Sequence, residues 1–185
     1  MQFTRGFATA IAAAVLLPAV ALGAEAPTAW LHPDARGLNR FGALPKPPRW
    51  VHPVDGRVGY GEAIARFGVA RPGHMHAGQD VFAPAGTPLR AVTDGVVFET
   101  GSDGGRGNYL ALYSKRSDET FVYFHMLEPA AVRPGRQIKA GKVVGKIGCT
   151  GSCQGDHLHF EIREGRGVTG RAVDPLPRLR RWDKI

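Results

Sequence analysis

Short apolar runs alternate with turn residues along most of the chain after residue 50. Gly, Pro and Asp separate the runs at intervals of about eight to twelve residues, and many runs alternate apolar with polar positions. The runs are DVFA, PLRAV, GVVFET, NYLALYS, ETFVYFHM, QIKA, KVVGKIG and HLHFEIR. This pattern predicts an all-β domain made mainly of antiparallel sheet. Only GEAIARFG, at residues 61–68, favours a short helical turn.

Two short segments in this region resemble each other. Residues 86–91 (GTPLRA) and 135–140 (GRQIKA) each have a glycine, an aliphatic residue three positions later, a basic residue and then alanine. A proline lies close to the start of each segment, and a further apolar run around a glycine follows each one. The similarity indicates a duplicated β unit.

The start of the chain has a different pattern. Residues 1–23 contain a lone basic residue, Arg5, followed by an Ala-rich apolar run and then small residues. This order is typical of a secretory signal peptide, and no cluster of positive residues follows to hold the segment in a membrane. We therefore expect cleavage after Gly23 or Ala26, no stable membrane span, and a mature protein that is secreted or periplasmic.

The remaining residues divide into three parts. Residues 24–50 are rich in Pro and Ala and lack periodicity, which predicts a linker or a wrapped arm. Residues 51–176 carry the strand pattern and are expected to form the domain. Residues 177–185 include the sequence RLRRWDK and are expected to be a solvated basic tail.

The charge of the chain limits the kind of partner. The formal net charge is +8 and the isoelectric point is about 10.0, so anionic partners are favoured. An exported protein meets cell-wall polymers and lipid head groups before nucleic acid. The composition therefore points to anionic cell-wall polymers and leaves open an extracellular polyanion-binding protein with a structural zinc.

Both cysteines of the chain lie close to two histidines in CTGSCQGDHLHFEI, at residues 149–162. By spacing alone, Cys149, Cys153, His157 and His159 could hold one structural zinc. In an exported protein, however, two cysteines usually form a disulfide. Because side chains alternate along a strand, the two histidines share a polar face while the apolar residues between and after them enter the core.

A second histidine cluster is HMHAGQD, at residues 74–80. His76 and Asp80 are four residues apart and can share a face if the segment enters a strand. One imidazole and one carboxylate suit zinc, and a third ligand from elsewhere would complete a catalytic site with an open position. His74 competes for the first ligand position, but Pro72-Gly73 place it in a loop, so we favour His76.

A third histidine lies near the end of TFVYFHM. Strict alternation places His125 on the same face as Phe121 and Tyr123. A buried structural histidine would be the ordinary interpretation. Since two other segments also carry histidines, we expect His125 to face the same cleft as they do.

The motifs HAGQD, YFH and HLHFE, in this order, closely resemble those of lysostaphin-like (LytM-type) zinc metallopeptidases. The similarity extends through DVFAPAGTPLRAVTDGVV, GSDGGRGNYLAL and VRPGRQIKAGKVVGKIG and covers about residues 50–175. The resemblance implies a β-rich domain of duplicated hybrid type with a groove that holds the zinc site. It also implies a metalloendopeptidase that acts on the stem or cross-link peptides of peptidoglycan, and the signal-peptide pattern is compatible with that role.

The resemblance further implies the role of each site residue. His76, Asp80 and His159 match the zinc ligands, and His125 and His157 match the two catalytic histidines. Every position of the motif is filled, which argues against the alternative of a non-catalytic wall-binding or hydrolase-activating module.

The resemblance leaves the cysteines without a role as ligands. Cys149 and Cys153 replace the small residues usual in that turn of the family, and we expect them to form a disulfide. Glu161 lies on the same strand face as His159, so it either orients that ligand or is merely exposed.

Overall fold

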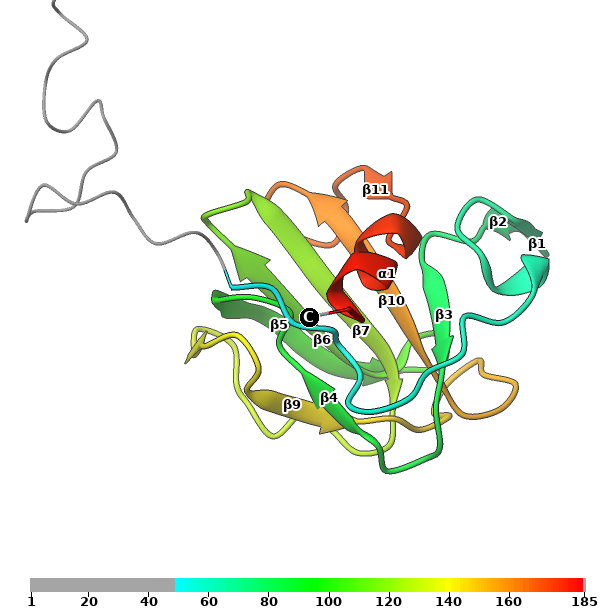
Figure 1. Ribbon diagram of the computed structural model, residues 1–185, viewed down its shortest axis with the longest axis horizontal. Coiled ribbons are helices and arrows are strands. Elements are labelled where there is room, and N and C mark those ends of the chain that lie inside the picture. Colours follow the sequence, from blue (N-terminus) through cyan, green and yellow to red (C-terminus); the bar gives the residue numbers. More distant parts are fainter. Residues whose placement is uncertain (1–48, 185) are drawn as a thin grey trace, which may run out of the picture. The chain divides into compact units, whose positions relative to one another are not determined.

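The computed structural model describes residues 49–184, shown as a ribbon in Figure 1. The expected signal peptide, residues 1–23, and all but the last two residues of the expected linker lie outside the described part. Within that part, no helix is long and apolar enough to cross a membrane.

A seven-stranded antiparallel sheet dominates the structure. Its strands follow the order β11-β10-β7-β6-β5-β8, and β3 pairs with β10 beside β7. The strands are β3 (Gln79–Phe82), β5 (Gly95–Asp103), β6 (Gly107–Ser114), β7 (Glu119–Met126), β8 (Gln137–Ile138), β10 (His157–Glu164) and β11 (Ala172–Val173). The predicted fold class, mainly antiparallel β, is confirmed.

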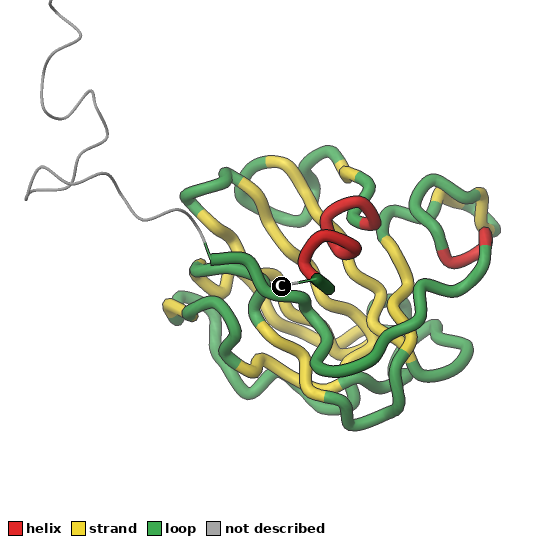
Figure 2. The backbone as a smooth tube through the Cα atoms, in the orientation of Figure 1, coloured by secondary structure: helices red, strands yellow, loops and turns green. Residues whose placement is uncertain are grey.

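Two small sheets and two helical segments complete the described part, and Figure 2 shows how little of it is helical. The small sheets pair β1 (Ala70–Arg71) with β2 (His74–Met75), and β4 (Pro88–Arg90) with β9 (Val143–Lys146). The predicted helical turn at residues 61–68 is a 3-10 turn, Ala63–Ala65.

The duplicated sequence segments occupy equivalent places in two interleaved units. Gly86 and Gly135 both have φ of +83°, in the left-handed region that glycine adopts without strain. Leu89 and Ile138, three residues later in each unit, are both buried. The first strand of each unit pairs with the second strand of the other, because β4 pairs with β9 and β8 pairs with β5. This exchange is the arrangement expected of a duplicated hybrid motif.

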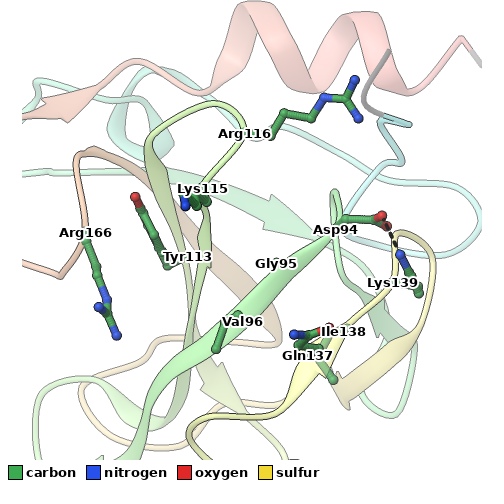
Figure 3. Close-up of a pocket in the computed structure, with 10 residues that line it drawn as sticks. All are labelled: Asp94, Gly95, Val96, Tyr113, Lys115, Arg116, Gln137, Ile138, Lys139 and Arg166. Carbon is green, nitrogen blue, oxygen red and sulfur yellow. Dashed lines mark hydrogen bonds and ion pairs between the residues drawn. The ribbon is translucent and has the colours of Figure 1, made fainter. Parts of the chain in front are cut away.

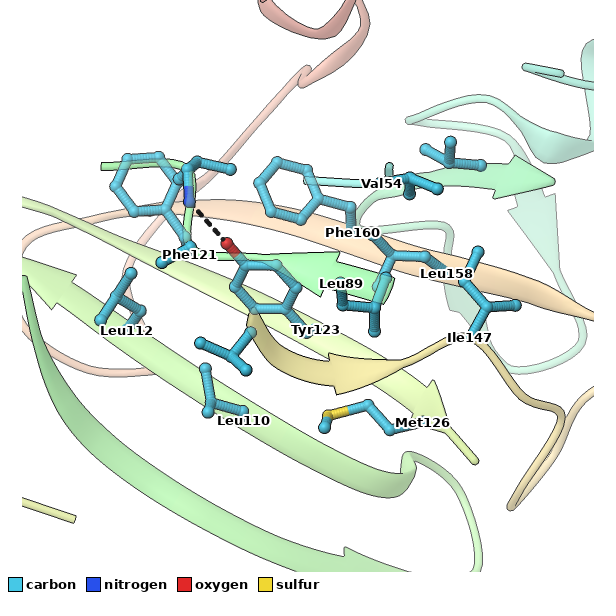
Figure 4. Close-up of a cluster of buried hydrophobic side chains, with 14 of the residues drawn as sticks. Val54, Leu89, Leu110, Leu112, Phe121, Tyr123, Met126, Ile147, Leu158 and Phe160 are labelled. Carbon is cyan, nitrogen blue, oxygen red and sulfur yellow. Dashed lines mark hydrogen bonds between the residues drawn. The ribbon is translucent and has the colours of Figure 1, made fainter. Parts of the chain in front are cut away.

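The hydrophobic core lies on one face of the large sheet, where Figure 4 shows its aromatic and aliphatic side chains packed together. Phe121 and Tyr123 of β7 and Phe160 of β10 are fully buried there. The Tyr123 hydroxyl donates to the Arg90 carbonyl at 3.1 Å and accepts from the Val92 N–H at 3.1 Å. The one polar group of this aromatic cluster is therefore satisfied.

The expectation of a solvated basic tail is wrong. Residues Leu176–Trp182 form helix α1, in which Leu179 and Trp182 are buried against the core. The Trp182 ring stacks on Trp50 with ring centroids 5.3 Å apart. Apolar residues at a spacing of three give the helix one apolar side. The basic side chains between these apolar residues led to the wrong prediction of a solvated tail.

Candidate metal centre

Three side chains from distant parts of the chain meet where β3 pairs with β10. In this pairing Asp80 lies directly opposite His159, and His76 comes from the segment before β3. The His76 Nε2 atom is 3.0 Å from Asp80 Oδ1 and 2.9 Å from His159 Nδ1. The third side of this triangle, between His159 Nδ1 and Asp80 Oδ1, is 3.0 Å. All three residues are buried.

The outer ring nitrogens fix how the two imidazoles are oriented. His76 Nδ1 is 2.7 Å from the Arg66 carbonyl, and His159 Nε2 is 3.1 Å from Glu161 Oε1. Since a carbonyl and a carboxylate only accept hydrogen bonds, each of these nitrogens carries a proton. The inner nitrogens then direct lone pairs at the Asp80 carboxylate oxygen. Three electron-rich atoms this close need a shared positive charge, and two nitrogens with one carboxylate oxygen form a donor set that fits zinc.

The electrostatics of the cluster agree with a site for a positive charge. Burial opposes ionisation of Asp80, but its close contacts with His159 and His76 outweigh it and hold the pKa of the carboxyl well below its ordinary value. Burial likewise opposes protonation of His159, but hydrogen bonds to Asp80 and Glu161 raise the pKa of its imidazole. Both shifts favour a positive charge between these side chains.

Two further histidines lie beside the triangle. The His157 Nε2 atom is 3.6 Å from Asp80 Oδ1, and the centroids of the His125 and His157 rings are 4.9 Å apart. Nδ1 of His125 donates to the Thr150 carbonyl, and Nδ1 of His157 donates to the Gly155 carbonyl, each at 2.8 Å. Burial lowers the pKa of His125 to about 4, against the effect of its bond to Thr150, so this imidazole is neutral near pH 7 with a free lone pair on Nε2.

The backbone at His125 explains how this side chain leaves the core face. The pairing of β6 with β7 shifts register between Asn108 and Leu110, which indicates a β-bulge. His125 has φ of +61°, in the left-handed region that a histidine rarely adopts. Strict alternation therefore fails here, and the placement of His125 on the face of Phe121 and Tyr123 is wrong. Instead His125 lines the groove next to Phe124.

The five side chains lie in a groove of about 1050 Å³. One part of its lining is apolar and exposed, with Ile64 at 64% and Met75 at 59% of full exposure. Another part is polar and includes Arg106 and Gln154. The groove therefore offers both apolar and polar surface to a ligand.

Charged side chains around the triangle form hydrogen bonds with its members. Arg71 donates to Asp80 Oδ2 at 2.7 Å, which leaves Oδ1 to face the histidines. Glu161 is buried, and its second carboxylate oxygen accepts from Arg163 Nε at 2.7 Å. Of the two interpretations of Glu161, contact with His159 or simple exposure, the structure shows the contact. Strand alternation could have found Arg163, two residues after Glu161. No sequence pattern pointed to Arg71, because its short hairpin was not predicted.

His74 and the cysteines lie outside the triangle. His74 begins β2 rather than lying in the loop as expected, and its exposed ring is 3.1 Å from the Pro72 carbonyl. Cys149 and Cys153 are joined by a disulfide, and Cys153 Sγ is 3.7 Å from His157 Nδ1. The four-ligand set of two cysteines and two histidines is therefore not formed.

Comparisons with known proteins agree with this geometry. The family model described as peptidase family M23 matches residues 74–175. The DD-carboxypeptidase/endopeptidase Mpg of Neisseria meningitidis is 36% identical over 116 residues, which cover 60% of this chain and 25% of the relative. The glycyl-glycine endopeptidase ALE-1 of Staphylococcus capitis is 35% identical over 125 residues, which cover 67% of this chain and 34% of the relative. The chain thus spans about a quarter to a third of these curated relatives.

A solved structure shows the same fold. The catalytic domain of lysostaphin from Staphylococcus simulans superposes with a TM-score of 0.57 at 33% sequence identity. The match covers 67% of this chain and 92% of that domain.

Proposed function

The chain belongs to peptidase family M23, and we propose that it is an exported zinc metalloendopeptidase that hydrolyses peptide bonds in bacterial peptidoglycan. The observation that carries the proposal is the meeting of His76, Asp80 and His159 in one groove, with two further histidines beside them. The names of relatives, among them a peptidoglycan DD-endopeptidase of Vibrio cholerae, support peptidoglycan peptides as the substrate. The pattern of residues 1–23 supports export to the cell envelope or beyond.

The metal would be held by His76 Nε2, Asp80 Oδ1 and His159 Nδ1. Zinc bound by two imidazoles and a carboxylate supplies Lewis-acid chemistry, since it acidifies water and polarises a carbonyl group. The outer hydrogen bonds to Arg66 and Glu161 place the proton of each neutral ring on the nitrogen that faces away from the metal position, so the inner nitrogens are the ones available as ligands.

His125 and His157 supply the proton transfers. Each has its Nδ1 proton committed to a backbone carbonyl, so its Nε2 lone pair is the free site. A neutral imidazole can take a proton from the attacking water and, once protonated, can stabilise the oxyanion or give the proton to the leaving amine. Burial of both rings excludes water that would compete for these protons.

Replacing Glu161 with glutamine is expected to weaken zinc binding by about ten- to a hundredfold, because the charged acceptor behind His159 is lost and Arg163 loses its partner. Competition with a chelator of known affinity measures the change. Glu164→Gln is the matched control, since Glu164 lies on the same strand but is exposed and pairs with Arg171. Equal zinc affinity in both variants would refute the orienting role of Glu161.

The disulfide loop and the residues just after it contact both histidines of the proposed proton transfer. Thr150, between the two cysteines, accepts from His125, and Gly155, just after the loop, accepts from His157. The double variant Cys149→Ser/Cys153→Ser is expected to lose kcat by roughly ten- to a hundredfold while KM and zinc content are retained, because loosened carbonyls misplace both rings. Steady-state kinetics and metal analysis measure the change, with Ser152→Ala in the same loop as control. A double variant with wild-type kcat would contradict this role of the loop.

The function itself is tested by digestion of purified peptidoglycans that differ in cross-link type. The mature protein with one equivalent of zinc should release fragments whose masses show one water added at a peptide bond, with the glycan strands intact. Mass spectrometry of the fragments also identifies the bond. Zinc-loaded protein that releases nothing from any of these substrates would overturn the proposal.

A further inference from the structure

A second cavity, of about 400 Å³, lies where the start of β5, the end of β6 and β8 come together (Figure 3). It shares no lining residue with the histidine groove. Tyr113 in its lining pairs with Thr120 of β7, which precedes His125 by five positions. At about 3.3 Å per residue, this places the cavity roughly 17 Å from the groove along the strand.

The cavity is strongly positive. Its lining includes four basic side chains, Lys115, Arg116, Lys139 and Arg166, and only one acidic one. The acidic residue, Asp94, is already engaged, because its carboxylate accepts from Lys139 Nζ at 3.0 Å and from the Ala140 N–H at 2.9 Å. Within residues 49–184, Lys115, Arg116 and Arg166 have no carboxylate partner. Four basic residues against one carboxylate give the lining a formal net charge of +3.

Most of the exposed lining of the cavity is apolar, and aromatic rings hold one of the cations in place. Val96, Tyr113 and Ile138 contribute side chains to the lining. The Arg166 guanidinium carbon lies 5.8 Å from the centroid of the Tyr113 ring and 5.6 Å from that of Phe98. These aromatic contacts position the guanidinium without using its N–H donors. The Tyr113 hydroxyl donates to Asp118 at 2.9 Å, which fixes the ring.

We propose that this cavity binds a phosphate group of a phosphodiester-linked sugar or polyol polymer of the cell envelope. Arginine and lysine side chains suit a phosphate, whose several oxygens can accept from more than one cation at once. A single peptide carboxylate would leave most of these charges unmatched. The apolar lining suits the C–H surface of the sugar or polyol. The assignment of the polymer to the cell envelope rests on the proposed export of the protein. Binding of the phosphate group does not depend on export.

Such a site would keep the enzyme on the wall while the groove takes up peptides. A polymer attached to peptidoglycan and bound here raises the effective concentration of cross-link peptides near the groove. The histidines take no part in this contact, so binding and hydrolysis are separable.

Titration of the mature protein with a synthetic glycerol phosphate oligomer tests the proposal. The variant Lys115→Glu/Arg166→Glu is expected to raise the dissociation constant by at least about tenfold, because two phosphate contacts become repulsive. The control Arg57→Glu/Lys142→Glu changes the net charge equally at two exposed positions outside the cavity and should change binding by less than about threefold. Both variants should hydrolyse a soluble peptide fragment at the wild-type rate.

NMR spectra of the wild-type protein locate the site without any substitution. The oligomer should shift the backbone amide signals of Val96, Tyr113 and Ile138, and a poly-glutamate of the same length should bind more weakly. No binding, equal weakening in the control variant, shifts confined to other residues, or equal binding of poly-glutamate would each overturn the proposal. A protein that fails to bind the oligomer but cleaves peptidoglycan would refute this site alone.

Discussion

Replacing His159 with alanine should abolish both zinc binding and hydrolysis. His159 Nδ1 completes the triangle with His76 and Asp80, and among the described residues no other histidine belongs to this group. The change also leaves the buried carboxylates of Asp80 and Glu161 without their shared partner, which opposes binding of the remaining ligands in the right geometry. Bound zinc should fall from one equivalent to a trace, and the rate should fall by at least roughly a thousandfold. Metal analysis and fragment release from peptidoglycan measure the two losses.

The control for this experiment is His74→Ala. His74 lines the same groove, but it is exposed and lies outside the triangle, so this variant should keep its zinc and its rate within about twofold. A thermal melt of both proteins shows whether each is folded. A folded His159→Ala protein that still binds one equivalent of zinc would contradict the ligand assignment.

Replacing His157 with alanine should separate metal binding from catalysis. His157 Nε2 lies 3.6 Å from Asp80 Oδ1, beside the triangle but not part of it, so zinc content should be unchanged. Loss of the imidazole that we propose to transfer protons should slow hydrolysis by about 10²- to 10⁴-fold. His125→Ala should behave in the same way. Single-turnover rates on a purified peptidoglycan fragment, measured with metal analysis of the same samples, test both.

This second experiment also separates the enzyme from a non-catalytic module of the same fold. A module that only binds the wall or activates another hydrolase needs neither His125 nor His157. Full function in His157→Ala, with zinc in place, would favour that alternative.

The strand pattern predicted the sheet well because its signals are local. Alternating apolar residues and flanking turns placed one strand over residues 119–126, the bounds of β7 in the structure. The same alternation placed His157 and His159 on one face. Asp80 lies opposite His159 because of the register between two strands, and these two residues are 79 positions apart in sequence. The periodicity of the sequence does not encode this register. The resemblance in motifs supplied that part of the prediction.

The wrong predictions also concern features that depend on contacts between distant segments or on local irregularities of the strands. The bulge at His125 adds a residue to one strand, and alternation counted along the sequence then gives the wrong face. Helix α1 is held by the contact of Trp182 with Trp50. The sequence pattern placed Trp182 in a basic tail and Trp50 in a linker or arm, so this contact was not predicted. Arg71 reaches Asp80 from a hairpin of very short strands, and two-residue strands leave no periodic signal.

Anomalous diffraction from crystals of the mature protein grown with zinc would show whether His76, Asp80 and His159 hold one metal ion. A single strong peak is expected at coordination distance, about 2 Å, from His76 Nε2, Asp80 Oδ1 and His159 Nδ1 together. A peak elsewhere, or three side chains that turn away from one another with no shared ion, would contradict the assignment of these three ligands.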